Sequence, residues 1–396
     1  MKKILYLLLI FYINSNAQWV SVNSNSTNNL QDVILTDTST GYIVGDNGTV
    51  LKTIDSGNNW SSVFTLNNTE WFISTSFINN QIGYILSPNN LYKTIDGGNS
   101  WLLLYSSSDV KNVVYFISEN IGFIGTNNGI LKTIDGGNNW INVQNTLHKI
   151  KSISFPSQDI GYFVGGSDSS DNIYKTINQG NNFDNYVLFM QSIKEKVYFI
   201  NDNIGYVIGW YSPWIKKTID GGLTWIDLFN SVNSGVGGME INFIDEINGF
   251  YIDNSGGQSN LFKTTNSGQT WSSELNLNTS LTYGFSKLST KFNKGFLIGE
   301  NGLIYKKDNL FLNINEKKNS DNIKIYPNPA TNEFKIATEK ILNKIEIVDN
   351  CGRIVKTIIP NLQTTTINVS DLSTGIYSVI LVCDGVAKDV KSLIVQ

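Results

Sequence analysis

Short apolar runs separated by polar turns recur along most of the chain. In the first unit, four such runs read DVILTD, GYIVGD, TVLKTID and NWSSVF. Alternation of apolar and polar residues over four to eight positions is typical of β-strands, and the Gly, Asn, Asp and Ser between the runs are typical of turns. Signals for helices are nearly absent. We therefore predict an all-β protein.

The four runs belong to a unit that recurs every 39 to 46 residues. In each unit a glycine followed by Tyr or Phe opens one run, and a lysine lies in the next. The glycines are Gly41, Gly83, Gly122, Gly161, Gly205, Gly249 and Gly295. The lysines are Lys52, Lys93, Lys132, Lys175, Lys217, Lys263 and Lys306. Four short strands per repeat of about 40 residues are typical of a blade of a β-propeller, so seven units predict seven blades.

An aromatic or apolar residue also precedes each of the first six glycines by six positions. These residues are Leu35, Phe77, Phe116, Phe155, Phe199 and Phe243. Six units further carry a large aromatic residue after the lysine run, at Trp60, Trp101, Trp140, Phe183, Trp225 and Trp271. The seventh unit lacks one.

The seventh unit therefore needs a fourth strand from elsewhere. Trp19 to Val22 reads like the fourth strand of the other units, so we predict that it completes the last blade. Such a pairing joins the two ends of the ring and covers two exposed strand edges. The stretch Leu310 to Asn315 is an alternative for the same position.

The turn before the aromatic residue has the pattern T-x-D-x-G-x-x-W. An Asp here accepts hydrogen bonds from backbone N–H groups of the turn, and a Gly supplies a left-handed backbone conformation. The acidic position is filled by Asp55, Asp96, Asp135, Asn178, Asp220 and Asn266. Because Asn replaces Asp in two units, we predict a structural role for the motif and no proton transfer. The pattern resembles the Asp-box of bacterial neuraminidase-type repeats.

Taken together, the repeated features of residues 18–309 resemble the photosystem II assembly/stability factor family of seven-bladed propellers. In the photosynthetic members of that family, a cluster of arginines on the propeller is tied to partner binding. The chain has one arginine, Arg353, which lies outside the repeats. The resemblance therefore implies the fold, and we do not carry over the activity.

A different module follows a polar linker over residues 310–322. Residues 323–396 resemble the type A sorting domain of the type IX secretion system of Bacteroidota. The matching positions are Tyr326, Pro327, Asn328, Pro329, Gly352, Gly375 and Tyr377, with Leu393-Ile394-Val395 at the end. The resemblance implies a small C-terminal β-sandwich that engages the type IX secretion machinery and is normally removed after export. An ordinary β-sandwich used for binding is the alternative.

The first residues have the layout of a secretory signal peptide. Lys2 and Lys3 precede the apolar run Ile4–Ile13, and Ser15 and Ala17 are small residues before a cleavage site at Gln18. The run is shorter than the ~20 residues that span a bilayer, and no other long apolar run follows. We predict a signal peptide over residues 1–17 and no transmembrane anchor. Together with the sorting domain, this predicts a protein released outside the cell or attached to its surface.

Composition restricts the chemistry. The net charge is -4, without a concentrated basic segment, which argues against nucleic-acid binding. The only histidine is His148, so a His/Cys metal cluster in the repeats is excluded, and a Ser-His-Asp triad would have to use that residue. Sialidases grip a carboxylate with three arginines, which this chain lacks. We expect no cofactor and no metal.

The two cysteines, Cys351 and Cys383, both lie in the C-terminal module. An exported protein meets an oxidising compartment, which permits a disulfide between them. Two free thiols fit the sequence equally well.

We expect a ligand to bind where the repeat is broken, on the face opposite the Asp-box turns. One candidate is Trp210, Tyr211 and Trp214, whose rings could anchor a partner or pack on their own blade. The other is Asp168 and Asp171 in a Ser/Gly-rich loop, which could hold calcium or simply be polar.

Three hypotheses of function are consistent with these features of the sequence. The first is a non-catalytic exported propeller that binds an extracellular protein or glycan. The second is a glycoside hydrolase that uses an unmarked pair of carboxylates. The third is a periplasmic or surface assembly factor.

Overall fold

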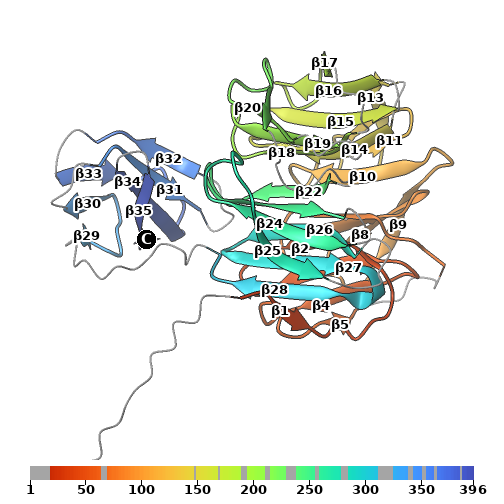
Figure 1. Cartoon of the computed structure of the whole chain (residues 1–396), viewed down its shortest axis with the longest axis horizontal. Coiled ribbons are helices and arrows are strands. Elements are labelled where there is room, and N and C mark those ends of the chain that lie inside the picture. The colour runs from red at the N-terminus through yellow and green to blue at the C-terminus, as the bar shows by residue number, and fades with distance from the viewer. Residues whose placement is uncertain are drawn as a thin grey trace, which may run out of the picture.

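The computed structural model describes residues 18–63, 69–146, 149–167, 170–188, 194–209, 215–228, 238–254, 258–277, 284–310, 324–337, 342–349, 354–360, 364–383 and 386–396. In these residues the chain is all-β, as predicted, and the only helical element is the short 3-10 turn η1 (Glu300–Gly302). Figure 1 shows the strands in two groups, formed by the N-terminal three-quarters of the chain and by its C-terminal part.

The described residues up to 310 form seven four-stranded antiparallel sheets. The first three consist of β2 (Leu30–Leu35), β3 (Gly41–Gly45), β4 (Val50–Thr53) and β5 (Ser61–Ser62); β6 (Ser74–Phe77), β7 (Gly83–Leu86), β8 (Asn90–Thr94) and β9 (Leu102–Ser106); and β10 (Lys111–Phe116), β11 (Gly122–Thr126), β12 (Gly129–Thr133) and β13 (Ile141–Asn145). The fourth and fifth consist of β14 (Lys149–Ser154), β15 (Gly161–Ser167), β16 (Ser170–Thr176) and β17 (Asp184–Leu188); and β18 (Lys194–Phe199), β19 (Gly205–Gly209), β20 (Ile215–Thr218) and β21 (Ile226–Leu228). The sixth consists of β22 (Gly238–Phe243), β23 (Gly249–Asp253), β24 (Ser259–Thr264) and β25 (Ser272–Leu277).

The seventh sheet joins the two ends of the ring. It contains β26 (Phe285–Lys291), β27 (Lys294–Gly299) and β28 (Ile304–Asp308), and its fourth strand is β1 (Val20–Val22). Val20 pairs with Lys306 and Val22 with Ile304, and Figure 1 shows the two labels side by side. The prediction that Trp19 to Val22 supplies this strand is therefore confirmed. Leu310 is buried beyond the end of β28, and residues 311–315 lie outside the described residues.

The first strand of each sheet contacts the first strands of the sheets before and after it, and β26 lies beside β2. Each sheet thus packs between two others, and the first strands surround the axis of the ring. Their inner edges would leave backbone N–H groups unpaired. Side chains of the preceding sheet bind several of them: Ser74 accepts from Val114 N at 3.3 Å, Ser76 from Phe116 N at 2.9 Å, and Ser154 from Phe199 N at 3.1 Å.

Aromatic rings fill the interfaces between neighbouring sheets. Tyr42 of the first sheet stacks on Phe77 of the second at 3.9 Å between ring centroids, and Trp101 meets Phe77 edge-on at 6.1 Å. The same trio recurs as Tyr84, Phe116 and Trp140. Offset-stacked and edge-on pairs are the favourable geometries for aromatic rings. At the interface between the sixth and seventh sheets, Trp19 occupies the position of the repeated tryptophan and lies edge-on to Phe250.

The spacing of six between Phe and Gly has a steric cause. Phe116 ends β10 and pairs directly with Gly122 at the start of β11, so its ring lies over the glycine. A Cβ atom on Gly122 would come within 2.5 Å of this ring. Only glycine leaves room for the ring, which explains why both residues recur together.

The C-terminal module contains two sheets. One has the order β29 (Lys324–Tyr326), β30 (Glu333–Ala337), β33 (Thr364–Asn368), and the other has β32 (Ile354–Ile358), β31 (Lys344–Val348), β34 (Gly375–Cys383), β35 (Val386–Val395). Both sheets contribute to one core, which includes Phe334 and Ile367 from the first and Ile347, Val379 and Leu393 from the second. Two sheets that share a core form the predicted β-sandwich.

Candidate functional site

The Asp-box turn is a closed network of hydrogen bonds. In the first sheet, Thr53 Oγ1 donates to Asp55 Oδ1 at 2.8 Å and accepts from Gly57 N at 2.9 Å. Asp55 Oδ1 also accepts from Asn59 N at 2.9 Å, and Asp55 Oδ2 from the Asn59 amide at 2.7 Å. The corresponding oxygens of Asp96, Asp135, Asn178, Asp220 and Asn266 accept from the hydroxyl and the backbone N–H at the same relative positions.

These bonds hold the carboxylates in the ionised form. The Asn59 side chain and backbone N–H lower the pKa of Asp55 to about 2. The pKa of Asp96, Asp135 and Asp220 is likewise lowered to about 2, since each also accepts a side-chain and a backbone hydrogen bond. A carboxylate with so low a pKa is a poor proton donor or acceptor near neutral pH.

Each turn is also bound by the preceding sheet. Tyr42 Oη and Lys52 Nζ both donate to the carbonyl of Gly97, at 2.9 and 2.7 Å. The Lys52 ammonium lies 5.5 Å from the centroid of the Tyr42 ring. The repeated Tyr and Lys thus fasten one sheet to the turn of the next. The arrangement recurs with Tyr84 and Lys93, and with Tyr162 and Lys175.

Most of the residues singled out from the sequence as ligand-binding lie outside the described residues. This holds for Trp210, Tyr211, Trp214 and Asp168, and also for His148 and Cys351. Asp171 lies in β16, where it pairs with Gly166 of β15. The prediction of a loop here was wrong in part, because β15 and β16 continue through most of the Ser/Gly-rich stretch. The side chains of Asp171 and Cys383 are not described.

A cluster of charges lies at the axis of the ring, and it was not predicted from the sequence. Lys196 Nζ of β18 is 2.7 Å from Glu240 Oε1 of β22. Lys287 Nζ of β26 is 3.3 Å from Glu240 Oε2 and 3.5 Å from Asp32 Oδ1 of β2. Asp32 Oδ2 also accepts from Thr75 N at 2.8 Å. We call these four side chains the axial charge cluster.

The charges of this cluster neutralise one another. Burial acts to lower the pKa of Lys287, but pairing with Asp32 and Glu240 outweighs it and raises this pKa. Burial lowers the pKa of Lys196, and Glu240 offsets only part of that effect. Three of the members, Asp32, Lys196 and Glu240, lie nine residues before the repeated glycine of their unit. An alignment of the repeats could have revealed them.

Other carboxylates on the face opposite the Asp-box turns are also bound. Asp46 accepts from the amides of Asn29 and Gln31 at 3.0 and 2.9 Å. Glu70 Oε1 accepts from the Asn90 amide at 2.7 Å and from Tyr92 Oη at 2.9 Å. Each of these acids has a structural role in joining strands or loops.

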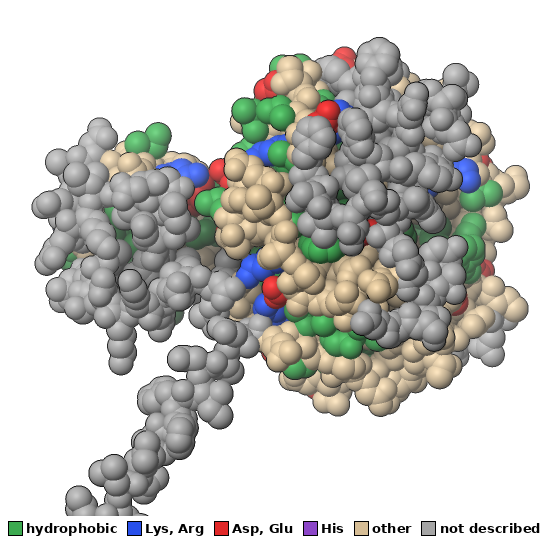
Figure 2. All heavy atoms as spheres, in the orientation of Figure 1, with side chains coloured by type: hydrophobic (Ala, Val, Ile, Leu, Met, Phe, Trp, Pro, Cys, Tyr) green, Lys and Arg blue, Asp and Glu red, His purple; other side chains and the backbone are tan. Residues whose placement is uncertain are grey.

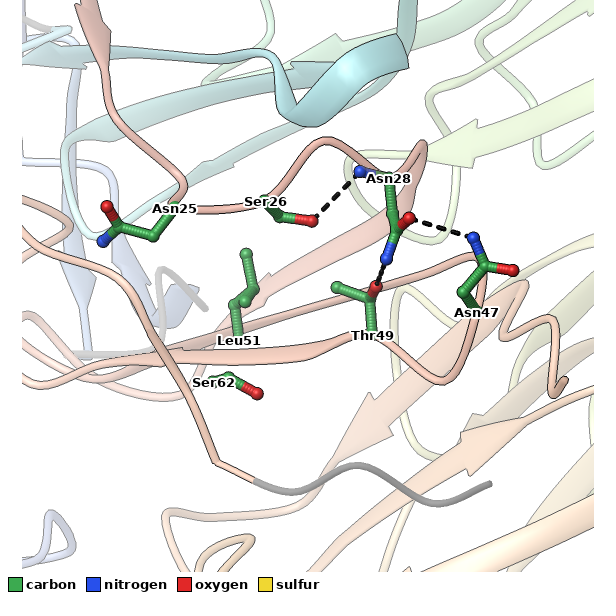
Figure 3. Close-up of a pocket in the computed structure, with 7 residues that line it drawn as sticks. All are labelled: Asn25, Ser26, Asn28, Asn47, Thr49, Leu51 and Ser62. Atoms are coloured by element: carbon green, nitrogen blue, oxygen red, sulfur yellow. Dashed lines mark hydrogen bonds between the residues drawn. The ribbon is translucent and has the colours of Figure 1, made fainter. Parts of the chain in front are cut away.

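The first sheet carries a pocket on the same face, with a volume of about 380 Å³. Figure 3 shows the segment that leads into β2 on one side and β4 with the adjoining Ser62 on the other. The lining residues are Asn25, Ser26, Asn28, Asn47, Thr49, Leu51 and Ser62. None of these side chains is ionisable, so the pocket is uncharged.

Trp71 follows Ser62, the last residue of the pocket lining, by nine positions, and it was not singled out from the sequence. Its side chain is 53% exposed, whereas Trp19, Trp60 and Trp101 of the repeat are buried. The sequence could have indicated this residue, because Trp71 is a tryptophan outside the repeated positions and therefore has no predicted role in packing between the sheets.

The described residues visible in Figure 2 show no strong bias of charge. Their Lys and Asp/Glu side chains are scattered, without a broad patch of one sign. No group of three or more His, Cys, Asp or Glu side chains that could hold a metal ion occurs among the described residues. The described part of the chain also contains no helix with the length and apolar character to cross a membrane.

The described residues of the sorting motif lie at the edge and in the core of the sandwich. Tyr326 ends the edge strand β29 and is exposed, and Pro327 and Pro329 follow it. Asn328 Oδ1 accepts from Ile394 N at 2.8 Å, which ties this segment to β35. Tyr377, next but one to Gly375, is buried, and its hydroxyl donates to Ser373 O at 2.8 Å. Gly352 lies outside the described residues.

Comparison with known families supports both modules. Residues 12–110 match the model described as Photosynthesis system II assembly factor YCF48, and residues 324–396 match the Secretion system C-terminal sorting domain. The chain thus combines a propeller that is similar to YCF48 over its first part with a C-terminal region that matches a sorting domain, as the resemblances implied. The sorting domain indicates export by the type IX secretion system to the cell surface or the extracellular space. The chain matches no curated protein.

Solved structures show the same fold at low identity. YCF48 bound to a D1 peptide is 20% identical, with a TM-score of 0.61, over 74% of this chain and 96% of that one. YCF48 from Cyanidioschyzon merolae is 16% identical, with a TM-score of 0.60, over 74% and 99%. A GH74 enzyme from Niastella koreensis is 16% identical, with a TM-score of 0.58, over 95% and 67%. At this identity, these likenesses show the fold alone.

Proposed function

We propose that this protein is a non-catalytic propeller that binds an extracellular protein or glycan with the face opposite its Asp-box turns. A signal peptide over residues 1–17 starts the export, and the sorting domain completes it in a member of the Bacteroidota. The propeller then acts at the cell surface or in the medium. The YCF48 structure with a bound D1 peptide is an example of a propeller of this type that carries a ligand.

The observation that carries the proposal is that four carboxylates of the propeller are already bound by lysines or by amide and hydroxyl groups. A glycoside hydrolase needs two carboxyl groups, about 5 to 10 Å apart, that can donate a proton and attack or activate water. Asp32 and Glu240 are paired with lysines, and Asp46 and Glu70 accept hydrogen bonds from neighbouring amide and hydroxyl groups. In contrast, the pocket of the first sheet offers amides and hydroxyls, which suit binding.

An assay on the chain from Gln18 to Gln396 tests this proposal against the hydrolase alternative. The protein is incubated with a panel of neutral and acidic polysaccharides, and new reducing ends are measured beside direct binding. We expect binding of a surface component without turnover. Hydrolysis that a single carboxylate substitution abolishes would contradict the proposal.

The export route is tested in the native cell. Deletion of residues 324–396 should leave the propeller in the periplasm, as measured by fractionation and immunoblotting. A propeller that still reaches the surface or medium without these residues would contradict the route.

A further inference from the structure

The pocket of the first sheet presents groups that suit a neutral ligand. Its lining consists of three Asn, two Ser, one Thr and one Leu, with no charge to offset that of an ionic ligand. Burying a charge without a partner is costly, so an ionic ligand is disfavoured. The volume of about 380 Å³ lies within the range of small-molecule sites, about 300–1,000 Å³.

The central amide of the pocket is held in place. Asn28 Nδ2 donates to Thr49 Oγ1 at 2.9 Å, and Asn28 Oδ1 accepts from Asn47 Nδ2 at 2.9 Å, as Figure 3 shows. Among the described residues, no partner binds the amide oxygens of Asn25 and Asn47 or the hydroxyl of Ser62. Two acceptors and one hydroxyl therefore stay available, and these groups pair well with the hydroxyls of a sugar.

The segment that carries an exposed indole lies next to the same turn. Gly48 N donates to Glu70 O at 2.7 Å, and Phe72 N donates to Gly45 O at 3.2 Å, so the segment with Trp71 is fixed to the turn with Asn47. The side chains of Glu70 and Phe72 both contact Tyr92 of the second sheet, whereas the indole between them is 53% exposed. The face of an indole carries negative charge density that attracts the C–H groups of a sugar ring.

We propose that Trp71 and the pocket around Asn47 form a binding site for a neutral oligosaccharide. A sugar ring stacks on Trp71, and its hydroxyls bind the free oxygens of Asn25, Asn47 and Ser62. This proposal rests on the binding function proposed above and specifies the class of ligand. A protein partner at the same position is an outcome of the test.

Calorimetric titration of the chain from Gln18 to Gln396 tests the site. The probes are cellohexaose, xylohexaose, mannohexaose and laminarihexaose, with hexagalacturonate as the charged counterpart. We expect one or more neutral probes to bind and the charged one not to. Trp71→Ala should lower the affinity for that probe at least tenfold, and Asn47→Gly severalfold. Asn47 has a φ of 54°, so glycine keeps the turn while the amide is lost.

A matched control is Ile95→Ala. Ile95 is 70% exposed and lies in the Asp-box turn of the second sheet, on the opposite face. This variant should bind like the unsubstituted chain, and circular dichroism should give all three variants the same fold.

Three results would overturn the inference. The first is that no neutral probe binds, or that the charged probe binds more tightly. The second is binding that survives both Trp71→Ala and Asn47→Gly; the site would then lie elsewhere, while the binding function would stand. The third is a purified surface protein that binds this face without any saccharide. Hydrolysis of a bound probe would instead contradict the proposed function itself.

Discussion

At the scale of single residues, each repeated side chain contacts its own turn or a neighbouring sheet. Thr53 and Asp55 close the turn, whereas Tyr42 and Lys52 reach the turn of the second sheet. A substitution in one unit therefore acts at two sheets. This double contact is a physical reason for a pattern so regular in the sequence.

The turn acid gives a prediction that depends on pH. Asp135→Ala should lower the melting temperature at pH 7, whereas Asp135→Asn should lower it less, because Asn178 makes the corresponding contacts in the fourth unit. The folded pKa of Asp135 is about 2, below the value of about 3.9 in an unfolded chain. Its contribution is thus present above pH 4 and is lost as the pH falls through 2. Melting curves from pH 7 to pH 2 check this. A difference between the alanine variant and the unsubstituted chain that was as large at pH 2 as at pH 7 would contradict it.

The glycine beneath the aromatic ring gives a second prediction. Gly122→Ala would place a Cβ atom 2.5 Å from the Phe116 ring, so the ring must move within a packed interface. Overpacking of this kind costs about 1–3 kcal/mol of unfolding free energy. Urea denaturation measures the loss, and an unchanged midpoint would be inconsistent with the steric account.

At the scale of elements, β1 is short but anchored by one large side chain. Its three residues pair with β28, and Trp19 beside them is 5% exposed and packs against Gly295 and Phe250. A strand of three residues makes few hydrogen bonds, so the buried indole provides much of its attachment. The closure of the ring thus depends on a residue just after the predicted cleavage site.

Trp19→Ala should therefore destabilise the propeller by about 3–5 kcal/mol, as expected for a buried tryptophan. The neighbouring Val20 is 54% exposed, and Val20→Ala should change the unfolding free energy by less than about 0.5 kcal/mol. Thermal and chemical denaturation of both variants check this. Equal stabilities of the two variants would show that β1 does not depend on the indole.

The described elements also show what a single sequence can reveal. The Gly-aromatic, Lys and Asp-box positions were predictable, because the same local contacts recur in unit after unit. The axial charge cluster was missed, since its members differ in residue type from unit to unit, although three of them share a position nine residues before the repeated glycine. The pocket of the first sheet was missed for another reason: its residues come from a non-repeated segment, from the turn between β3 and β4, and from two strands. The domain boundaries and the sites at Trp210 and Asp168 stay predictions.

At the scale of the whole molecule, the axial charge cluster joins four consecutive sheets, β18 to β2, across the point of closure. Glu240 is 1% exposed and is shared by two lysines whose side chains are 17% and 28% exposed. A buried carboxylate that balances two cations is hard to replace. The cluster therefore holds together the sheets on both sides of the closure.

Glu240→Gln should leave Lys196 and Lys287 without full compensation. Removal of one partner of a buried pair costs about 3–5 kcal/mol, and we expect about 3 kcal/mol here because both lysines reach water. Asp227→Asn is the control, since the Asp227 side chain paired with Lys216 is 40% exposed, and its loss should cost less than about 1 kcal/mol. Chemical denaturation compares the two. Equal losses would indicate that the axial charges are effectively solvated.

The pairing of β1 with β28 also sets an order in time. Val20 pairs with Lys306, which lies 286 positions later. The first strand of the propeller therefore cannot pair until the last strand of the propeller has been synthesised. The entropy of loop closure makes this contact about 1.7 kcal/mol less favourable than one within a repeat of about 40 residues. Contacts so distant in sequence form slowly. The propeller can thus complete its ring only after almost all of its chain has been synthesised, and until then the first sheets are stabilised only by their neighbours.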